Sequence, residues 1–403
     1  MRNKDLFNRK IASSETARDI NRSVVLNIIR TNQLISRADL ARQTGLQRST
    51  VSLIVEQLLK ERWVVEGAVG QLPRGRKPRL LMLNTERAGI LGVNVLPSGT
   101  HIVLADLNAN FKAQESIPTS EDAKEFLKLL SLRLRELMSA HPRIAYEGVG
   151  VSLPGRVDYA AQKLVFAPNL GWRDVDLKTP LERATGLPVQ IENAANACAL
   201  SEVWSGPYEG VQDLIAVTVS EGIGTGVIVN GHLVRGPSGA AGEFGHVPLN
   251  DDGPPCGCGS RGCWEVYASN AAAIRNYNGG LGGNGVGANK KRTSASISNF
   301  NDLLLLVDRG DVKAAEVIDQ MACYLGSGIA MLVNGLAPSV ITIVGEVTRA
   351  WDRVGPIVER VACVRAKTHA GTKIVPSDAT SQPRLKGTIA LVLQKHFQPH
   401  LVT

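Results

Sequence analysis

One histidine and three cysteines have the spacing of a closed metal site. His246, Cys256, Cys258 and Cys263 form the pattern H-x9-C-x-C-x4-C, and glycines between the cysteines allow the loop to fold tightly. Three thiolates and one imidazole are the ligand set of a tetrahedral structural zinc. A disulfide is the alternative, but the polar N-terminus lacks the apolar stretch of a secretory leader, which disfavours it. We therefore expect one structural Zn²⁺ in this loop.

The elements that must hold this loop are short strands and helices that alternate along most of the chain. From about residue 88 onward the sequence is rich in glycine, alanine and valine, and apolar segments of strand length are separated by helical stretches. Alternation of this kind indicates an α/β fold. The clearest strands are residues 89–96, 100–107, 146–153, 213–219, 226–231 and 340–345, and the clearest helices are 123–140, 317–333 and 385–397.

Length and composition predict a soluble protein with more than one domain. The chain has 403 residues, of which 44% are hydrophobic and 20% are charged. These values are typical of globular proteins, and the length exceeds that of one ordinary core. No run of about 18 apolar residues is present, which excludes a membrane-spanning helix. Without a leader or a membrane span, we expect a cytoplasmic protein that has no membrane partner.

The first 84 residues are strongly basic, whereas the rest of the chain is almost neutral. Residues 1–84 contain 16 Lys and Arg against 7 Asp and Glu, a net charge of +9, while the whole chain carries +8. A basic segment attached to a neutral body favours a module that binds a polyanion. Charge alone leaves a solvated basic tail as the alternative.

Apolar spacing within this basic segment predicts a helix-turn-helix. Residues 24–33 have one apolar face, and a second helix begins at Ser36 with a capping box completed by Asp39. Gly45 suits a tight turn with positive φ, and a third helix begins near Gln47. The inward residues of this third helix are expected to be Val51, Ile54, Val55, Leu58 and Leu59.

The start of the third helix and the hairpin that follows it are the predicted DNA contacts. Residues 63–69 and 76–83 predict two antiparallel strands joined by a basic wing at 70–78. Arg and Gln side chains read base edges in the major groove, whereas Ser and Thr bind phosphates. A small helical bundle is the alternative for the helices alone, but the basic hairpin favours a winged helix-turn-helix that binds double-stranded DNA. The predicted contact residues are Gln47, Arg48, Ser49, Thr50, Ser52, Arg74, Arg76 and Lys77.

Seven segments of the chain resemble the ROK family, which comprises repressors, open reading frames and sugar kinases. They are VSLPGRVD at 151–158, PNLGW at 168–172, IENAANACAL at 191–200, EGIGTGVIVNG at 221–231, GAAGEFGHVPL at 239–249, CGCGSRGCWEVYAS at 256–269 and the stretch 324–345. The N-terminal module resembles the regulator branch, whose members respond to sugars such as xylose, N-acetylglucosamine or glucose, and it is absent from the kinases.

The resemblance implies a two-lobed α/β fold of the actin-like, ribonuclease-H-like ATPase type behind the winged helix. The DNA-binding domain would occupy residues 1–84 and the sensor 85–403. Within the sensor, a small lobe at about 85–190 would be completed by the C-terminal helix at about 381–403, and a large lobe would occupy about 191–380. The resemblance lapses at residues 276–298, a Gly- and Asn-rich segment that we interpret as a flexible insertion.

The resemblance also implies zinc at the four positions above and a sugar site beside them. Carboxylates and amides pair with vicinal hydroxyls, and such a site discriminates because buried unpaired polar groups are costly. For Glu243 or Glu265 taken alone, a solvated loop carboxylate is the alternative. The implied sugar-binding residues are Asn193, Glu243, His246 and Glu265, with Gly155 and Asn169 lining the same cleft.

Three departures from the family kinases predict that catalysis has been lost. The kinases carry an Asp general base in E-N-D-A-N, where this chain has Ala194. Their D-x-G-G-T phosphate loop is replaced by residues 94–100, in which Asn94 replaces the acid and Leu-Pro-Ser intrudes. Their I-x-I-G-G ends here in Glu346, a carboxylate where nucleotide would lie. Although the glycine loop 222–226 survives, we expect no catalytic residue and no nucleotide cofactor.

These observations predict a sugar-responsive transcriptional regulator, more often a repressor than an activator in this family. Its effector would be a small sugar or sugar phosphate, and it would act as a homodimer or homotetramer. An active ATP-dependent sugar kinase with an appended DNA-binding domain is the alternative. A second alternative keeps DNA binding but replaces the sugar by a protein partner.

Overall fold

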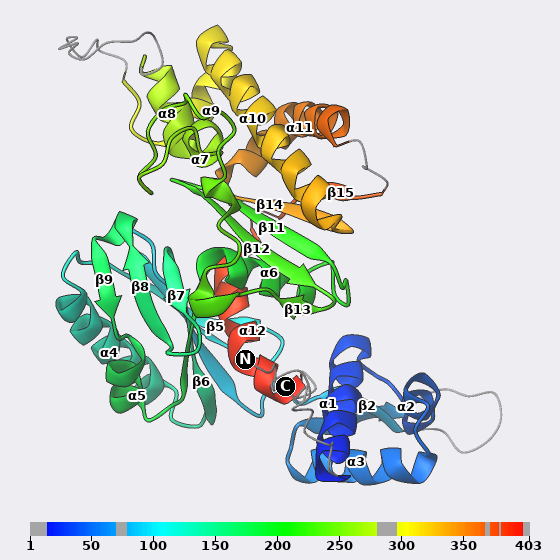
Figure 1. The fold of residues 1–403 in the computed structure, drawn as a ribbon. Coiled ribbons are helices and arrows are strands. Elements are labelled where there is room, and N and C mark those ends of the chain that lie inside the picture. Colours follow the sequence, from blue (N-terminus) through cyan, green and yellow to red (C-terminus); the bar gives the residue numbers. More distant parts are fainter. Residues whose placement is uncertain (1–13, 70–78, 280–295, 367–370, 379, 398–403) are drawn as a thin grey trace, which may run out of the picture.

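The computed structural model describes residues 14–69, 79–279, 296–366, 371–378 and 380–397. Its first part, here called the head, consists of three helices and a two-stranded hairpin, and the remainder is called the body (Figure 1). The head contains α1 Ser14–Asn32, α2 Arg37–Thr44, α3 Arg48–Lys60, β1 Val64–Val69 and β2 Arg79–Leu83. Strands β1 and β2 pair in the antiparallel sense, as the sequence predicts. The predicted wing at 70–78 lies outside the described residues.

Local signals set the helix ends in the head. Ser36 accepts a hydrogen bond from the backbone of Asp39, whose side chain accepts one in return, so the predicted capping box is present. Gly45 ends α2 with φ of 70°. Four of the five predicted inward residues of α3 are buried, but Leu59 is only half-buried at the edge of the core.

The lower lobe of the body is a five-stranded sheet with helices on both faces (Figure 1). Its strand order is β10-β6-β3-β4-β5, with β3 paired in parallel to β6 and antiparallel to β4. Helix α4 packs on one face, and α12 packs on the other. The strands are β3 Gly89–Asn94, β4 Thr100–Ala105, β5 Phe111–Ile117, β6 Tyr146–Leu153 and β10 Val189–Asn193; the helices are α4 Ala123–Ala140, α5 Lys178–Thr185 and α12 Pro383–Phe397.

A small antiparallel sheet extends this lobe between β6 and α5. It contains β7 Arg156–Asp158, β8 Lys163–Ala167 and β9 Trp172–Val175, in the order β7-β8-β9. A single turn of 3-10 helix, η1 Pro168–Leu170, joins the last two strands.

The upper lobe repeats the same topology. Its order β13-β12-β11-β14-β15, read from the other edge, matches that of the first sheet strand for strand, which is the duplication expected of an actin-like fold. The strands are β11 Leu214–Val219, β12 Ile223–Val229, β13 His232–Leu233, β14 Val340–Val344 and β15 Lys373–Pro376. The helices are α6 Ala194–Trp204, α7 Glu265–Ala268, α8 Asn270–Tyr277, α9 Phe300–Asp308, α10 Val312–Leu336 and α11 Trp351–Arg365. The 3-10 turns are η2 Pro237–Gly239, η3 Phe244–His246 and η4 Glu346–Ala350.

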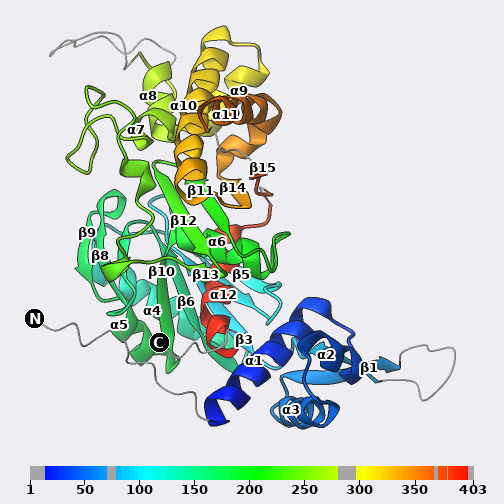
Figure 2. The same ribbon diagram turned by 45° about the vertical axis from the view of Figure 1, so that its right-hand side comes forward.

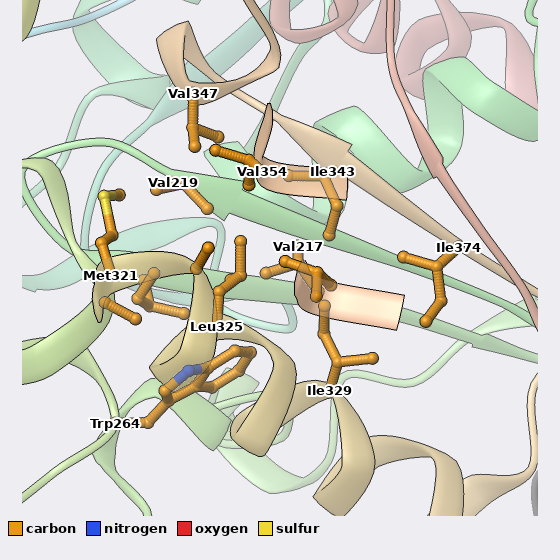
Figure 3. Packing of buried hydrophobic residues seen from close by; sticks show 14 of the residues in the cluster. Val217, Val219, Trp264, Met321, Leu325, Ile329, Ile343, Val347, Val354 and Ile374 are labelled. Atoms are coloured by element: carbon orange, nitrogen blue, oxygen red, sulfur yellow. The ribbon is translucent and has the colours of Figure 1, made fainter. Parts of the chain in front are cut away.

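The upper core lies between this sheet and α10. Val217 and Ile343 of the sheet pack with Leu325 and Ile329 of α10, and Trp264 fills the space below them (Figure 3). All of these side chains are fully buried. Helix α6 covers the opposite face of the sheet.

Helices α6 and α12 cross between the two lobes, where α12 is the red helix at the centre of both views (Figures 1 and 2). A Cβ atom on Gly387 of α12 would lie 1.9 Å from the carbonyl oxygen of Ala197 in α6, so only glycine allows this approach. Gly226 of β12 likewise lies against the carbonyl of Ala195. The first turn of α6 is thus fixed between α12 and the upper sheet.

Two sequence expectations can be compared with the chain path. The predicted insertion at 276–298 begins too early, because residues 276 and 277 belong to α8, and its segment 280–295 lies outside the described residues. No helix in the described part of the chain is long and apolar enough to cross a membrane.

Candidate functional site

The histidine and the three cysteines meet in the fold. The metal-binding atoms of His246, Cys256, Cys258 and Cys263 all lie within 4.8 Å of one another. The Cys258 and Cys263 sulfurs are 3.7 Å apart, and the Cys256 sulfur is 3.5 Å from Nδ1 of His246. A tetrahedron with Zn–S bonds of about 2.3 Å has edges of about 3.8 Å. The donor set and its spacing therefore fit a closed zinc site.

Backbone pairing and one tryptophan hold this cluster on the upper core. Pro248 pairs with Cys263 in an isolated β-bridge, and Trp264 N–H donates to the carbonyl of Val247 at 2.9 Å. The indole Nε1 of Trp264 donates to the carbonyl of Tyr324 in α10 at 3.0 Å. Trp264 is fully buried, so the cluster is tied to the interior of the lobe (Figure 3).

Two of the predicted sugar-binding carboxylates lie around the cluster. Glu243 Oε2 is 3.9 Å from Nε2 of His246, the nitrogen that faces away from the cysteines. Glu265 accepts a hydrogen bond from Ile223 N–H at 3.0 Å and lies 3.9 Å from the Cys256 sulfur. Glu265 therefore joins the start of β12 to the cluster.

The other predicted sugar-binding residues form a second group at the start of α6. Asn193 caps this helix, accepting from Ala195 N–H at 2.8 Å, and its Nδ2 donates to the carbonyl of Gly155 at 2.6 Å. The Asn193 amide is thus already engaged on both sides. Asn169 is exposed on η1, shortly after Ala167, against which Gly155 packs.

Electrostatics connect the two groups. Partial burial raises the pKa of Glu243, and the nearby His246 and Arg156 side chains oppose that shift. Arg156 is the neighbour of Gly155 in the lower lobe. Glu243 therefore interacts electrostatically with a residue of the lower lobe as well as with the cluster.

Sequence reasoning missed a buried ion pair beside the start of α6. Glu192 is 2% exposed and accepts from Nε of Arg235 at 2.7 Å and from Nδ2 of Asn196 at 2.9 Å. The Arg235 guanidinium lies 3.8 Å over the ring of Tyr159. Glu192 stands in the IENAAN segment, so its importance could have been inferred, but the sequence contains no sign of its partner.

The positions predicted to have lost kinase chemistry lie at strand and helix ends. Ala194 is the first residue of α6 and is partly exposed. Asn94 ends β3 and accepts from Ser152 Oγ at 3.2 Å. Glu346 begins η4 and accepts from Nδ2 of Asn270 at 2.8 Å.

In the head, the predicted DNA-contacting residues of α3 lie at its exposed start. Gln47 precedes the helix without capping it, and Gln47, Arg48 and Ser49 are exposed. Thr50 and Ser52 are half-buried. Leu53, which the sequence reasoning missed, is 67% exposed on the same helix. Arg74, Arg76 and Lys77 lie outside the described residues.

One arginine of the head is inserted into the body. Arg30, near the end of α1, donates to the carbonyl of Trp204 at 2.6 Å and lies 2.5 Å from Oε1 of Glu209. Its guanidinium is 4.3 Å from the centre of the Trp204 ring and 5.8 Å from that of Phe397. Burial lowers the pKa of Arg30, while Glu209 opposes the shift.

A second contact joins the head to the end of α12. Trp63 of the head packs on His396 and Phe397 of α12, with ring centres 4.5 Å and 5.8 Å apart. Arg87 lies 3.8 Å over the Trp63 ring and forms an ion pair with Glu147.

Together these features define a class: a winged helix-turn-helix head on a duplicated, kinase-like α/β body that carries a Cys3His cluster. The chain belongs to the ROK family, whose model matches residues 91–395, and residues 18–65 match the model described as winged helix-turn-helix DNA-binding.

Three comparisons illustrate the relationship. A protein named xylose repressor from Bacillus subtilis (strain 168) is 31% identical over 392 residues, which cover 96% of this chain and 98% of the relative. A crystal structure of a ROK family transcriptional regulator, described as a homologue of the E. coli MLC protein, shares the fold with a TM-score of 0.79, 24% identity and coverage of 95% of this chain and 98% of that one. A ROK family glucokinase from Streptomyces griseus in complex with glucose and AMPPNP gives a TM-score of 0.66 at 26% identity, covering 76% of this chain and all of its own.

Proposed function

We propose that this protein is a sugar-responsive transcriptional repressor whose body is a sensor without kinase activity. The head supplies the exposed start of α3 for the major groove. The relative named xylose repressor matches nearly the whole chain, head included. Carbohydrate is therefore the effector class that we assign, and double-stranded operator DNA is the partner.

The residues around the Cys3His cluster and at the start of α6 form the proposed sugar site, here called the zinc-side site. Zn²⁺ would be held by the Cys3His cluster, where its role is to fix the loop. With Nδ1 of His246 directed to the metal, Nε2 remains to contact a sugar hydroxyl beside Glu243. Glu265 would accept from a sugar hydroxyl, and the second Nδ2 hydrogen of Asn193 would donate to one, with Gly155 and Asn169 lining the site.

Loss of catalysis is part of the proposal. Phosphoryl transfer needs a base to accept the proton of the attacking hydroxyl, and Ala194 has no group that can accept one. Sugar binding needs only the hydroxyl partners. The sugar is therefore bound and released unchanged.

The single observation that carries this function is the position of α6. Asn193, a proposed sugar ligand, caps its first turn, and Trp204, which receives Arg30 from the head, ends its last. Eleven residues at 1.5 Å per residue give a helix of about 16 Å. A shift at the sugar site is thus delivered to the head through one rigid element.

The response follows from two arrangements with unequal sugar affinity. If sugar favours the arrangement that holds the head away from the operator-binding geometry, DNA affinity falls as sugar saturates the protein. The loss cannot exceed the differential affinity of the sugar for the two arrangements. In a homodimer or homotetramer, sugar would change the distance between the two α3 helices that bind the operator.

The experiment combines purified full-length protein, operator DNA and a panel of xylose, glucose and N-acetylglucosamine. We expect one sugar to release the DNA in a gel-shift titration. The same sugar with ATP and Mg²⁺ should yield no sugar phosphate by mass spectrometry. Phosphorylated sugar would instead support the alternative, a kinase with an appended DNA-binding domain. Ala194→Asp alone should remain inactive, because the phosphate loop at 94–100 is also altered.

A further inference from the structure

Leu53 is an exposed apolar side chain on the helix that the head offers to DNA. Its exposed fraction is 67%, although α3 packs its other apolar residues inward. The buried residues of this helix are Val51, Ile54, Val55 and Leu58. They lie on one face, so helical periodicity directs Leu53 to the opposite face, away from the core.

The position of Leu53 matters more than its exposure, because single exposed apolar residues are common on protein surfaces. Ser49 is exposed in the first turn of α3 and stands four positions before Leu53, so the two side chains are neighbours on one face of the helix. Helix α3 runs along the lower edge of the molecule in both views (Figures 1 and 2). Leu53 therefore continues the surface that begins with the predicted DNA contacts.

The other exposed large apolar residues of the described chain lie elsewhere. Leu34 is the only one that also belongs to the head, and it stands in the turn between α1 and α2 rather than on α3. The remainder, including Val312 and Val364, belong to the body. Within the described residues, Leu53 is thus the one large exposed apolar side chain on the DNA-facing helix.

The major groove contains one apolar group that suits such a side chain. Thymine presents its C5-methyl group there, whereas the other bases present hydrogen-bond donors and acceptors. Leucine has neither a donor nor an acceptor. Against a polar base edge it would displace water without replacing the lost hydrogen bonds, which is costly. A leucine in the groove therefore discriminates in favour of thymine.

We propose that Leu53 reads a thymine in each half-site of the operator, through contact between its methyl groups and the C5-methyl group of that base. The inference rests on the proposed function, DNA binding by the head, and adds the base that one residue selects. Glu56 is exposed on the same face three positions later. Because DNA phosphates repel its carboxylate, the start of α3 is the part that enters the groove.

The test first selects an operator from random duplex DNA with the full-length protein. Each thymine of a half-site is then replaced in turn by deoxyuridine, which lacks the C5-methyl group, and the Kd is measured by fluorescence anisotropy. We expect one replacement per half-site to weaken wild-type binding about three- to fivefold, the value of one buried methyl group. The Leu53→Ala protein should bind the thymine and deoxyuridine duplexes equally at that position, because the cycle removes both partners of one contact.

Two further variants complete the design. Leu132→Ala removes an exposed leucine from α4 of the body and should keep the full wild-type penalty for deoxyuridine. Leu53→Gln keeps the length and the helix propensity of leucine but ends in an amide, so it should also lose the response to the methyl group. It gives a second reading if Leu53→Ala does not fold.

The outcomes separate this inference from the function on which it rests. If wild type selects an operator but no deoxyuridine replacement weakens binding, or if every penalty persists in both Leu53 variants, Leu53 does not read thymine. A smaller mass of Leu53→Ala in analytical ultracentrifugation would instead assign the residue to a contact between two copies of the chain. Failure of the wild type to select any sequence would contradict operator binding itself, and this inference with it.

Discussion

Arg30 and Trp204 join the head to the body through two contacts at once. The guanidinium donates to the Trp204 carbonyl at 2.6 Å and lies 4.3 Å over the centre of its ring. Only 9% of the Arg30 side chain is exposed, so this charge is paired within the protein rather than in water. Because Trp204 ends the helix that Asn193 caps, one helix connects the proposed sugar site to this contact.

Arg30→Met should reduce the response of operator binding to sugar. Methionine retains part of the apolar packing but cannot donate to Trp204 or pair with Glu209. Coupling free energies between sites are typically about 1–3 kcal/mol. We expect Arg30→Met to lose most of the coupling between sugar binding and DNA binding. Gel-shift titrations with and without sugar measure the change. Arg18→Met on the same helix, where the arginine donates to Gln57 of the head, should respond as the wild type does.

Arg48→Ala should weaken binding to the cognate operator by about 1–3 kcal/mol, as expected for loss of a base-reading arginine. Binding to unrelated duplex DNA should change much less. Fluorescence anisotropy with both DNA molecules measures the difference. An equal loss on both would mean that Arg48 binds phosphate and does not read sequence.

Cys258→Ser should abolish zinc binding, whereas Cys363→Ser, an exposed cysteine outside the cluster, should retain one zinc per chain. Structural zinc contributes directly to folding, so the loop around His246 should become mobile without it. Elemental analysis measures the metal content. The sugar response should disappear before DNA binding does, because the cluster lies in the upper lobe, whereas α3 belongs to the head. A zinc-free wild-type protein would contradict the assignment.

Glu243→Gln should raise the sugar Kd about tenfold or more while changing the melting temperature little. Hydrogen bonds to charged groups contribute about 1.5–3 kcal/mol, and Glu243 is half-exposed. Glu265→Gln should weaken sugar binding and also lower the melting temperature, because Glu265 accepts a hydrogen bond from the Ile223 N–H. Calorimetry and thermal unfolding separate the two effects. Unchanged sugar affinity in both variants would contradict the assignment of the sugar to the zinc-side site.

Acid should remove the stability that Glu147 contributes beside the junction between head and body. The hydrogen bond from His396, with that from Arg87, holds the pKa of Glu147 at about 2, against an ordinary 4.5. A carboxyl group whose pKa is lower in the folded protein than in the unfolded chain stabilises the fold when it is ionised. For Glu147 this stabilisation is complete above pH 4.5 and is lost as the pH falls toward 2. The unfolding free energy of Glu147→Gln should therefore lie below that of wild type at neutral pH, and the gap should narrow below pH 4.5. Urea titrations at several pH values test this, with the exposed Glu136→Gln as control.

The sequence predicted most of the secondary structure because the signals are local. The capping box at Ser36, the turn at Gly45 and the six apolar strand segments each depend on residues a few positions apart. The spacing of His246 and the three cysteines is likewise compact enough to identify a donor set, and the structure brings these four residues together. A family resemblance then linked these segments to one architecture.

Other relationships exist only because the chain folds back on itself. Arg30 and Trp204 are 174 positions apart, and Glu192 is 43 positions from Arg235. No local pattern marks such pairs, since a basic residue on a helix is usually solvated. The cavity of about 470 Å³ between the lobes is also lined by segments that lie far apart in the sequence. The sequence thus determined which groups are available for metal, sugar and DNA, whereas tertiary packing decided which are paired and how the sensor is joined to the head.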